Sequence, residues 1–106
     1  MIAYDLYGAK NLSLMLAREH VEKLLGVSLN ERNSCYQGGD YYMYGSNKYE
    51  NFILKVNLDP FDDVPVELCF HEYSILLYIN ATDRSSDIED AIKKGECFEL
   101  LRHEVF

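Results

Sequence analysis

The sequence predicts an α+β protein, in which a mostly antiparallel sheet of about five strands is packed with two helices. Two segments have apolar residues at helical spacing, several others alternate apolar and polar residues as strands do, and the loops between the middle strands are short. The expected order is α-β-β-β-β-α-β. With 106 residues and no linker, repeat or low-complexity tract, the chain has the length of a single domain, 1–106.

The two helices are indicated by periodicity and by capping residues. The first is expected over 11–25, where mostly apolar residues recur every three or four positions (Leu12, Met15, Leu16, His20 or Val21, Leu24 and Leu25) and Gly26 follows as the residue beyond the C-cap. The second is expected near Ser86 and Glu89, which have the spacing of a capping box. This shorter helix is closed by Lys93, Lys94 and Gly95.

Five segments are predicted to be strands. They are an aromatic segment over 41–44, alternating segments over 52–58 and 66–70, a nearly continuous apolar segment over 74–79, and a C-terminal segment within 98–106. Alternation is the pattern of a half-buried strand, whereas a continuous apolar run is typical of a central strand covered on both faces. Short connections favour antiparallel neighbours.

The net charge of −8 is distributed unevenly along the chain. Residues 1–55 contain six acidic and six basic residues, whereas 56–106 contain twelve acidic and four basic ones. Such a field repels nucleic acid and attracts basic surfaces. A solvated acidic face without any partner explains the same imbalance, because many proteins are acidic for colloidal reasons.

Cellular location and cofactors follow from what the sequence lacks. It has no apolar run of membrane-spanning length, and its N-terminus lacks the basic and apolar regions of a signal peptide. Its three cysteines, Cys35, Cys69 and Cys97, are odd in number and widely spaced, which is typical of reduced thiols. We expect a cytoplasmic protein without membrane contact, metal or cofactor.

Motifs for catalysis and metal binding are weak. The best candidate nucleophile is Cys35 with His71 or His103 as its base, but Cys35 has no flanking family signature, and unpaired thiols are most often small buried side chains. The acidic loop over 59–63 lacks the spacing of a calcium loop, and 37–40 lacks the lysine of a phosphate loop. The chain is therefore not expected to be an enzyme.

The abundance of tyrosine is the most distinctive feature of the sequence. There are nine tyrosines and no tryptophan, and four of the tyrosines lie between 41 and 49. Tyrosine is enriched at protein interfaces because it joins a rigid apolar body to a polar tip. If 41–44 is a strand, Tyr41 and Tyr42 point to opposite faces and one of them belongs to the core. The tyrosines and the acidic run together predict a partner-binding surface of Tyr42, Tyr44, Tyr49, Asp59, Asp62, Asp63, Glu67 and Glu72.

Most of the chain resembles the small immunity proteins of bacterial toxin systems, particularly those of contact-dependent growth inhibition. The likeness is carried by RNSCYQGGDYY (32–42), VELCF (66–70), LLYI (76–79) and TDR (82–84), which leads into a short helix. Because these families share no catalytic motif, the resemblance assigns no residue role. It implies a cytoplasmic protein that neutralises a cognate toxin domain, often a ribonuclease attacking tRNA, by occluding its basic active-site surface.

Two other classes of function stay open. A small adaptor or regulatory subunit would form homo- or hetero-oligomers, for example through an exposed sheet edge or the 98–106 strand. A small enzyme would depend on Cys35 or on a carboxylate pair placed beside a histidine. In the inhibitor class, the expected partner is a toxin domain with a basic surface, without direct contact with nucleic acid.

Overall fold

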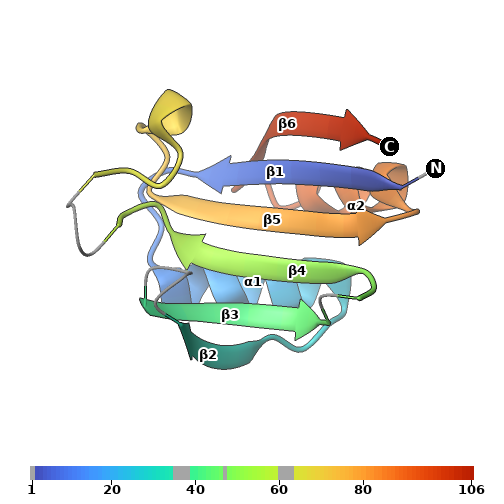
Figure 1. Ribbon diagram of the computed structural model, residues 1–106, viewed down its shortest axis with the longest axis horizontal. Coiled ribbons are helices and arrows are strands. Elements are labelled where there is room, and N and C mark those ends of the chain that lie inside the picture. The colour runs from blue at the N-terminus through green and yellow to red at the C-terminus, as the bar shows by residue number, and fades with distance from the viewer. Residues whose placement is uncertain (1, 35–38, 47, 60–63) are drawn as a thin grey trace.

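An antiparallel sheet of six strands, with two α-helices packed on one face, makes up the fold (Figure 1). The computed structural model describes residues 2–34, 39–46, 48–59 and 64–106. In chain order, the described elements are β1 (Ala3–Ala9), α1 (Leu14–Leu25), β2 (Asn30–Ser34), β3 (Gly39–Gly45), β4 (Asn51–Val56), the short 3₁₀ helix η2 (Leu68–Phe70), β5 (Ile75–Thr82), α2 (Ser85–Lys93) and β6 (Glu99–Val105). The predicted α+β class is confirmed, with six strands rather than about five.

Two strands are missing from the predicted order, and both depend on pairing rather than on side-chain pattern. The strand order is β2-β3-β4-β5-β1-β6, so β1 lies inside the sheet between β5 and β6. Asp5 and Gly8 interrupt the apolar pattern of β1, yet backbone pairing on both edges makes it a strand. β2 contains only polar residues and is held as an edge strand by β3.

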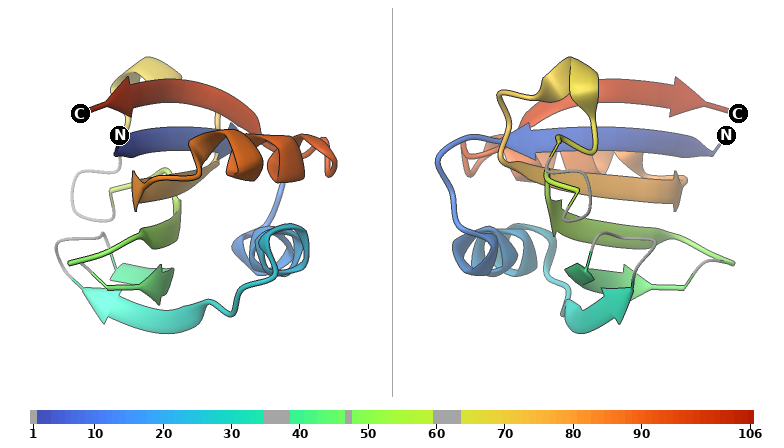
Figure 2. Two further views of the ribbon diagram at one scale, coloured as in Figure 1. Left: turned by 90° about the vertical axis from the view of Figure 1, so that its right-hand side faces the viewer. Right: turned by 60° about the vertical axis from the view of Figure 1, so that its left-hand side comes forward.

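The main core lies between the helices and the sheet (Figure 2). From the helices it receives Ala17, Val21, Ile88 and Ile92, which are fully buried against residues of β1, β4 and β5. β5 is the predicted central strand: its neighbouring residues Leu76 and Leu77 point to opposite faces and are both fully buried.

The opposite side of the sheet, which carries Tyr4, Ile53 and Tyr78, is only partly covered, and we call it the open face. A smaller cluster of Tyr41, Met43 and Ile53 packs with Tyr78 there. The connection between β4 and β5, which contains η2, leaves the sheet at the end remote from the two termini (Figure 1). Near the termini the open face has no helix over it (Figure 2).

Helix α1 ends where the sequence predicts, but both helices begin at other residues than expected, and α1 begins at Leu14 rather than at residue 11. Gly26 ends α1 with a φ of 65°, and its N–H bonds to Glu22, as predicted for the residue after a helix. The capping box at Ser86 is wrong, because the N-cap is Arg84 and α2 begins at Ser85, so that Ser86 lies inside the first turn. The Ser85 hydroxyl donates to the buried carboxylate of Asp5, so a tertiary contact determines where this helix starts.

The segment 66–70 is not a strand, although its apolar residues alternate. β4 pairs directly with β3 and with β5, so the sheet has no free position for a further strand between β4 and β5. Leu68–Phe70 instead forms η2, and both Val66 and Leu68 are exposed. The alternation therefore does not mark a buried face here.

The buried side chain of Asn57 holds this connection in place. Its amide nitrogen donates to the carbonyl oxygens of Phe70 at 3.1 Å and Tyr73 at 2.9 Å, and its amide oxygen accepts from the N–H of Glu67 at 2.9 Å. One side chain thus bonds to three backbone groups of a connection that is mostly irregular, and two of them, the Tyr73 carbonyl and the Glu67 N–H, are bonded to Asn57 rather than to the backbone.

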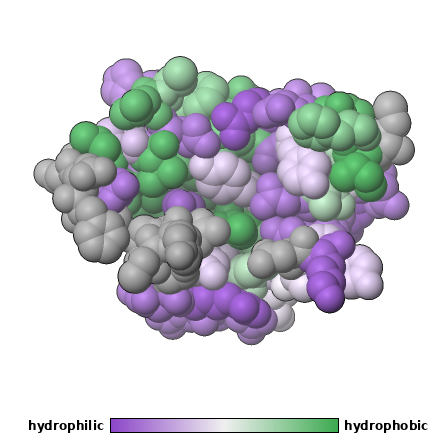
Figure 3. Space-filling model, viewed as in Figure 1, coloured by the Kyte–Doolittle hydropathy of each residue, from purple (hydrophilic) through white to green (hydrophobic). Residues whose placement is uncertain are grey.

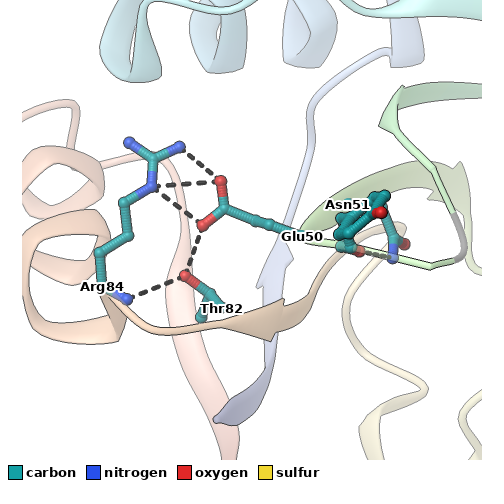
Figure 4. A network of polar contacts seen from close by, with 5 residues as sticks. Glu50, Asn51, Thr82 and Arg84 are labelled. Carbon is teal, nitrogen blue, oxygen red and sulfur yellow. Dashed lines mark hydrogen bonds and ion pairs between the residues drawn. The ribbon is translucent and has the colours of Figure 1, made fainter. Parts of the chain in front are cut away.

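A second polar network joins the start of β4 to the end of β5 (Figure 4). The carboxylate of Glu50 accepts two-pronged hydrogen bonds from Arg84 at 2.7 and 2.9 Å and a hydrogen bond from the hydroxyl of Thr82 at 2.6 Å. Beside it, the amide of Asn80 donates to Asn51 at 3.0 Å. The Arg84 guanidinium lowers the pKa of Glu50 below its ordinary value.

We predict that Asn57→Ala lowers the free energy of unfolding by about 2 to 4 kcal/mol, because it removes the partner of the Tyr73 carbonyl and of the Glu67 N–H and one of the two donors to the Phe70 carbonyl. Urea unfolding followed by circular dichroism measures the change. Asn33→Ala is the matched control, since the Asn33 amide makes an exposed hydrogen bond to Asp40, and we expect a loss below about 0.5 kcal/mol. Equal losses in the two variants would contradict this role for Asn57.

Glu50→Gln should lower the melting temperature at neutral pH and lose this effect in acid. Because the folded pKa of Glu50 lies below 4.5, the stability from its ionised form is fully present above pH 4.5 and is lost as the pH falls through the folded pKa. The gap between wild type and Glu50→Gln therefore narrows below pH 4.5. Arg84→Gln should open a similar gap and the double variant should add little; additive losses would contradict the pairing.

Candidate functional site

A groove of about 710 Å³ crosses the open face near the two chain termini. Figure 3 shows that apolar side chains gather at this end of the sheet, beside polar ones. The groove is lined by Ile2, Tyr4, Asp5, Tyr78, Asn80, Arg102, Glu104 and Phe106. Three adjacent strands, β5, β1 and β6, therefore contribute to one concave surface.

Strand alternation explains which side chains reach the groove. Tyr4 on β1 is paired with Glu104 on β6, and side chains that are directly opposite in an antiparallel pair share a face. Phe106 continues this face beyond β6, because its N–H and C=O both bond to Ile2 at 2.8 and 3.3 Å. The groove thus depends on residues from both ends of the chain.

Two aromatic rings form the apolar wall of the groove. Tyr4 and Phe106 pack edge to face with ring centroids 5.4 Å apart. Phe106 is 75% exposed, Tyr4 41% and the neighbouring Ile2 40%. Apolar side chains that are clustered and exposed in this way are typical of a surface that another molecule covers.

Hydrogen-bonded charges form the other wall. The guanidinium of Arg102 contacts the carboxylates of Glu104 at 3.2 Å and Glu67 at 3.5 Å, and the hydroxyl of Tyr78 donates to Glu67 at 2.7 Å. Burial, and then the bond to Glu67, raise the pKa of Tyr78. Because two carboxylates contact Arg102, this wall is not an anion-binding site.

On the helix side of β1 and β6, a carboxylate, an imidazole and a hydroxyl come together. His103 Nδ1 lies 2.5 Å from Asp5 Oδ1, and the Ser85 hydroxyl lies 2.5 Å from Asp5 Oδ2. Asp5 is almost completely buried, whereas His103 is about half exposed beside a second, smaller hollow. The two donors satisfy a carboxylate that burial would otherwise destabilise.

These three residue types suggest a hydrolase triad, but their geometry does not. In a Ser-His-Asp triad, the carboxylate binds one imidazole nitrogen and the serine hydroxyl faces the other. Here the hydroxyl of Ser85 lies 3.4 Å from the same Nδ1 that contacts Asp5, and it donates its own proton to Asp5. The cluster connects β1, α2 and β6, and it does not activate Ser85 as a nucleophile.

Of the tyrosines predicted to bind a partner, two belong to the core side of the sheet. The ring of Tyr42 lies under the guanidinium of Arg18 at 4.7 Å, and Tyr44 packs against Phe52 with ring centroids 4.9 Å apart. Both are partly buried against the main core. Tyr49, in the β3–β4 turn, is 74% exposed.

Of the acidic residues predicted to bind a partner, Asp59, Glu67 and Glu72 lie in or beside the β4–β5 connection, which leaves the sheet at the end remote from the β3–β4 turn (Figure 1). Asp59 is partly buried and its backbone bridges to Val64, while Glu72 lies 3.7 Å from His71 at the surface. Glu67 is turned toward Tyr78 and Arg102. The predicted Asp62 and Asp63 lie outside the described residues.

Asp59 and Glu67 have a second role around Lys55. The side chain of Lys55 is buried on the open face, and burial lowers its pKa while the charges of Glu67 and Asp59 oppose that shift. The structure therefore brings these two predicted acids together, but it does not bring them to the tyrosines. Their predicted contact with a partner stays a prediction.

Neither the nucleophile nor the metal candidates gain support from the described residues. Cys35 lies outside them; Cys69 is an exposed free thiol and Cys97 a partly buried one. Within the described part of the chain, no group of three or more His, Cys, Asp or Glu side chains is placed to hold a metal ion. No helix there has the length and apolarity needed to cross a membrane.

The groove itself was missed by sequence reasoning. Its aromatic wall joins Tyr4 to Phe106, residues that are separated by almost the whole chain and lie outside every motif. The sequence does show an aromatic residue near each end of the chain. These two residues form one site only because β1 pairs with β6.

Comparisons with known proteins do not assign the chain to a family. No model of a known protein family matches it, and no curated protein has a significantly similar sequence.

Ser85 should not react as an activated nucleophile. We expect no covalent adduct after incubation with diisopropyl fluorophosphate, because the Ser85 proton is committed to Asp5 and not to a free imidazole nitrogen. Intact-mass spectrometry measures this, with a serine protease as the positive control. An adduct mapped to Ser85 would restore the hydrolase alternative.

Proposed function

We propose that this chain is a non-catalytic inhibitor that binds another protein, and that the groove between β5, β1 and β6 is its main contact surface. Within this class, the resemblance described above favours an immunity protein that neutralises a toxin domain with a basic surface. The proposal places the protein in the cytoplasm, where such a toxin would act, and it involves no cofactor.

The exposed aromatic pair in the groove is the observation that carries this proposal. Phe106 and Tyr4 expose apolar area to water. Burying this area against a partner would stabilise the complex by about 25 cal/mol for each Å². Aromatic side chains at the centre of a contact typically contribute more binding energy than the residues around them. Glu104 and Arg102 beside them supply polar groups for the rim.

Charge supports a basic partner. The net charge is −8, and along α2 and β6 the acids outnumber the bases. Three of the bases in that part of the chain contact carboxylates of the same chain: Arg84 contacts Glu50, Lys93 contacts Glu89 and Arg102 contacts Glu104. The remaining field attracts a basic protein surface and repels nucleic acid.

The mechanism that follows is occlusion. A ribonuclease toxin binds RNA phosphates through Lys, Arg and His side chains, and carboxylates of the inhibitor would occupy the same positions. The aromatic pair would anchor the complex, while the long-range field would speed association. The predicted acids Asp59, Asp62, Asp63 and Glu72 are not among the residues of the groove, and they would act mainly on the association rate through their charge.

To test this, the tagged protein is produced in its own host and purified. The protein that co-purifies with it is identified by mass spectrometry and then produced separately. Titration calorimetry then measures the dissociation constant of the pair at low and high salt. We expect Tyr4→Ala and Phe106→Ala each to weaken binding by about 10- to 100-fold, because anchors of this kind dominate protein interfaces.

Tyr49→Ala is the matched control. Tyr49 is as exposed as Phe106 but lies at another part of the sheet, so its loss should leave the dissociation constant nearly unchanged. If Tyr49→Ala weakens binding and the two groove variants do not, the interface is formed by the residues predicted from the sequence and not by the groove. A partner whose activity continues while it is bound would overturn the inhibitor function altogether.

A further inference from the structure

Strand β6 is an edge of the sheet, and its outward backbone groups can be assigned. β6 ends the strand order, with β1 as its neighbour. Phe106 and Ile2 exchange both of their backbone hydrogen bonds. In an antiparallel ladder such pairs alternate with non-bonded ones, so Glu104 and Arg102 bond to β1, whereas the N–H and C=O groups of His103 and Val105 point away from the sheet.

We propose that β6 pairs with β6 of a second copy, antiparallel and with the two-fold axis at His103, so that two sheets become one continuous sheet. In this register the two His103 residues exchange backbone hydrogen bonds through the groups that point outward. Arg102 of each copy then lies directly opposite Glu104 of the other. The proposal does not depend on the proposed function.

The side chains of β6 select this register over its neighbours. Moving the axis to Arg102 would place two arginines opposite each other, and moving it to Glu104 would place two glutamates opposite each other. Like charges in directly opposite positions are destabilising, whereas opposite charges stabilise a strand pair. Arg102 and Glu104 already contact each other at 3.2 Å within one strand, so the dimer would contain a quartet of alternating charges.

Apolar residues flank the charged centre. In the same register Leu101 lies opposite Val105, whereas Leu100 lies beyond the bulge and is turned to the face of Tyr7. Val105 is 43% exposed, so this edge presents apolar area that pairing would cover. Leu101 is the extra residue at a bulge, where the pairing of β6 with β1 shifts between Arg102 and Leu100. The regular ladder to the second copy therefore centres on 102–105.

The proposed dimer would place the open faces of both copies on the same side of the joined sheet. An antiparallel strand pair with a two-fold axis perpendicular to the sheet keeps equivalent faces on the same side. Because Arg102 and Glu104 line the groove, the two grooves would open side by side on one surface next to the seam. The helices of both copies would cover the other surface.

Sedimentation velocity of the purified chain alone tests the proposal. A short strand pair is a small interface, so we expect a dimer with a dissociation constant of about 1 to 100 μM, seen as a mass rising from 12.3 kDa toward twice that value with concentration. A monomer up to about 1 mM would overturn the proposal.

Charge variants test the register. Arg102→Glu and Glu104→Arg should each weaken the dimer by at least about 100-fold, since each places four like charges at the seam. The double variant Arg102→Glu/Glu104→Arg restores alternating charges and should dimerise again. A dimer that tolerates the single reversals, or is not rescued by the double one, would overturn this register. Glu31→Arg on the opposite edge strand β2 is the control and should leave the dimer intact.

Val105→Pro tests the backbone ladder separately. The Val105 N–H is not used within the sheet, so proline should leave the fold intact, as circular dichroism and thermal unfolding can check, while it removes a donor from the seam. We expect a folded monomer. A folded variant that still dimerises as strongly as wild type would show that β6 does not form the contact.

Discussion

The position of β1 inside the sheet is the constraint on which the rest of the structure depends. This N-terminal strand pairs with residues 75–82 on one edge and 99–105 on the other, so the sheet is complete only when the two ends of the chain meet. Its buried Asp5 carboxylate also binds Ser85 at the start of α2 and His103 on β6. Pairing strands that are so distant in sequence costs loop-closure entropy before the contacts form. By contact-order reasoning, β1 and β6 therefore pair late in folding.

Uneven covering of the sheet creates the candidate site. Both helices bury one face, and among the described residues the connection between β4 and β5 packs over one end of the other face, where Glu67 contacts Tyr78. The end that stays open is the one where β1 and β6 bring the two termini together (Figure 1). The same pairing that completes the core therefore also creates an exposed groove with an aromatic wall and an unpaired edge strand beside it.

Several polar and tyrosine residues that the sequence predicts at a binding surface instead make contacts within the protein. Glu67 belongs to the acidic run that the sequence assigns to a partner, yet its carboxylate is bound by Tyr78 and Arg102. Tyr42 and Tyr44 belong to the tyrosine-rich segment, yet they pack against the main core. Composition counts such residues equally, because it contains no information about the direction of a side chain. Direction is decided by strand register, which depends on the partner strand.

The sequence by itself determined the features that depend on local interactions: the first helix and its end at Gly26, although not its start, the apolar central strand β5, the alternation in β4 and the α+β class. These features depend on periodicity and capping, which operate within a few residues. Tertiary structure alone decided that β1 and β2 are strands, that 66–70 is not one, where α2 begins, and that Tyr4 meets Phe106. Each of these outcomes depends on which backbone edges are already occupied and which buried group needs a partner, and both are properties of residues distant in sequence.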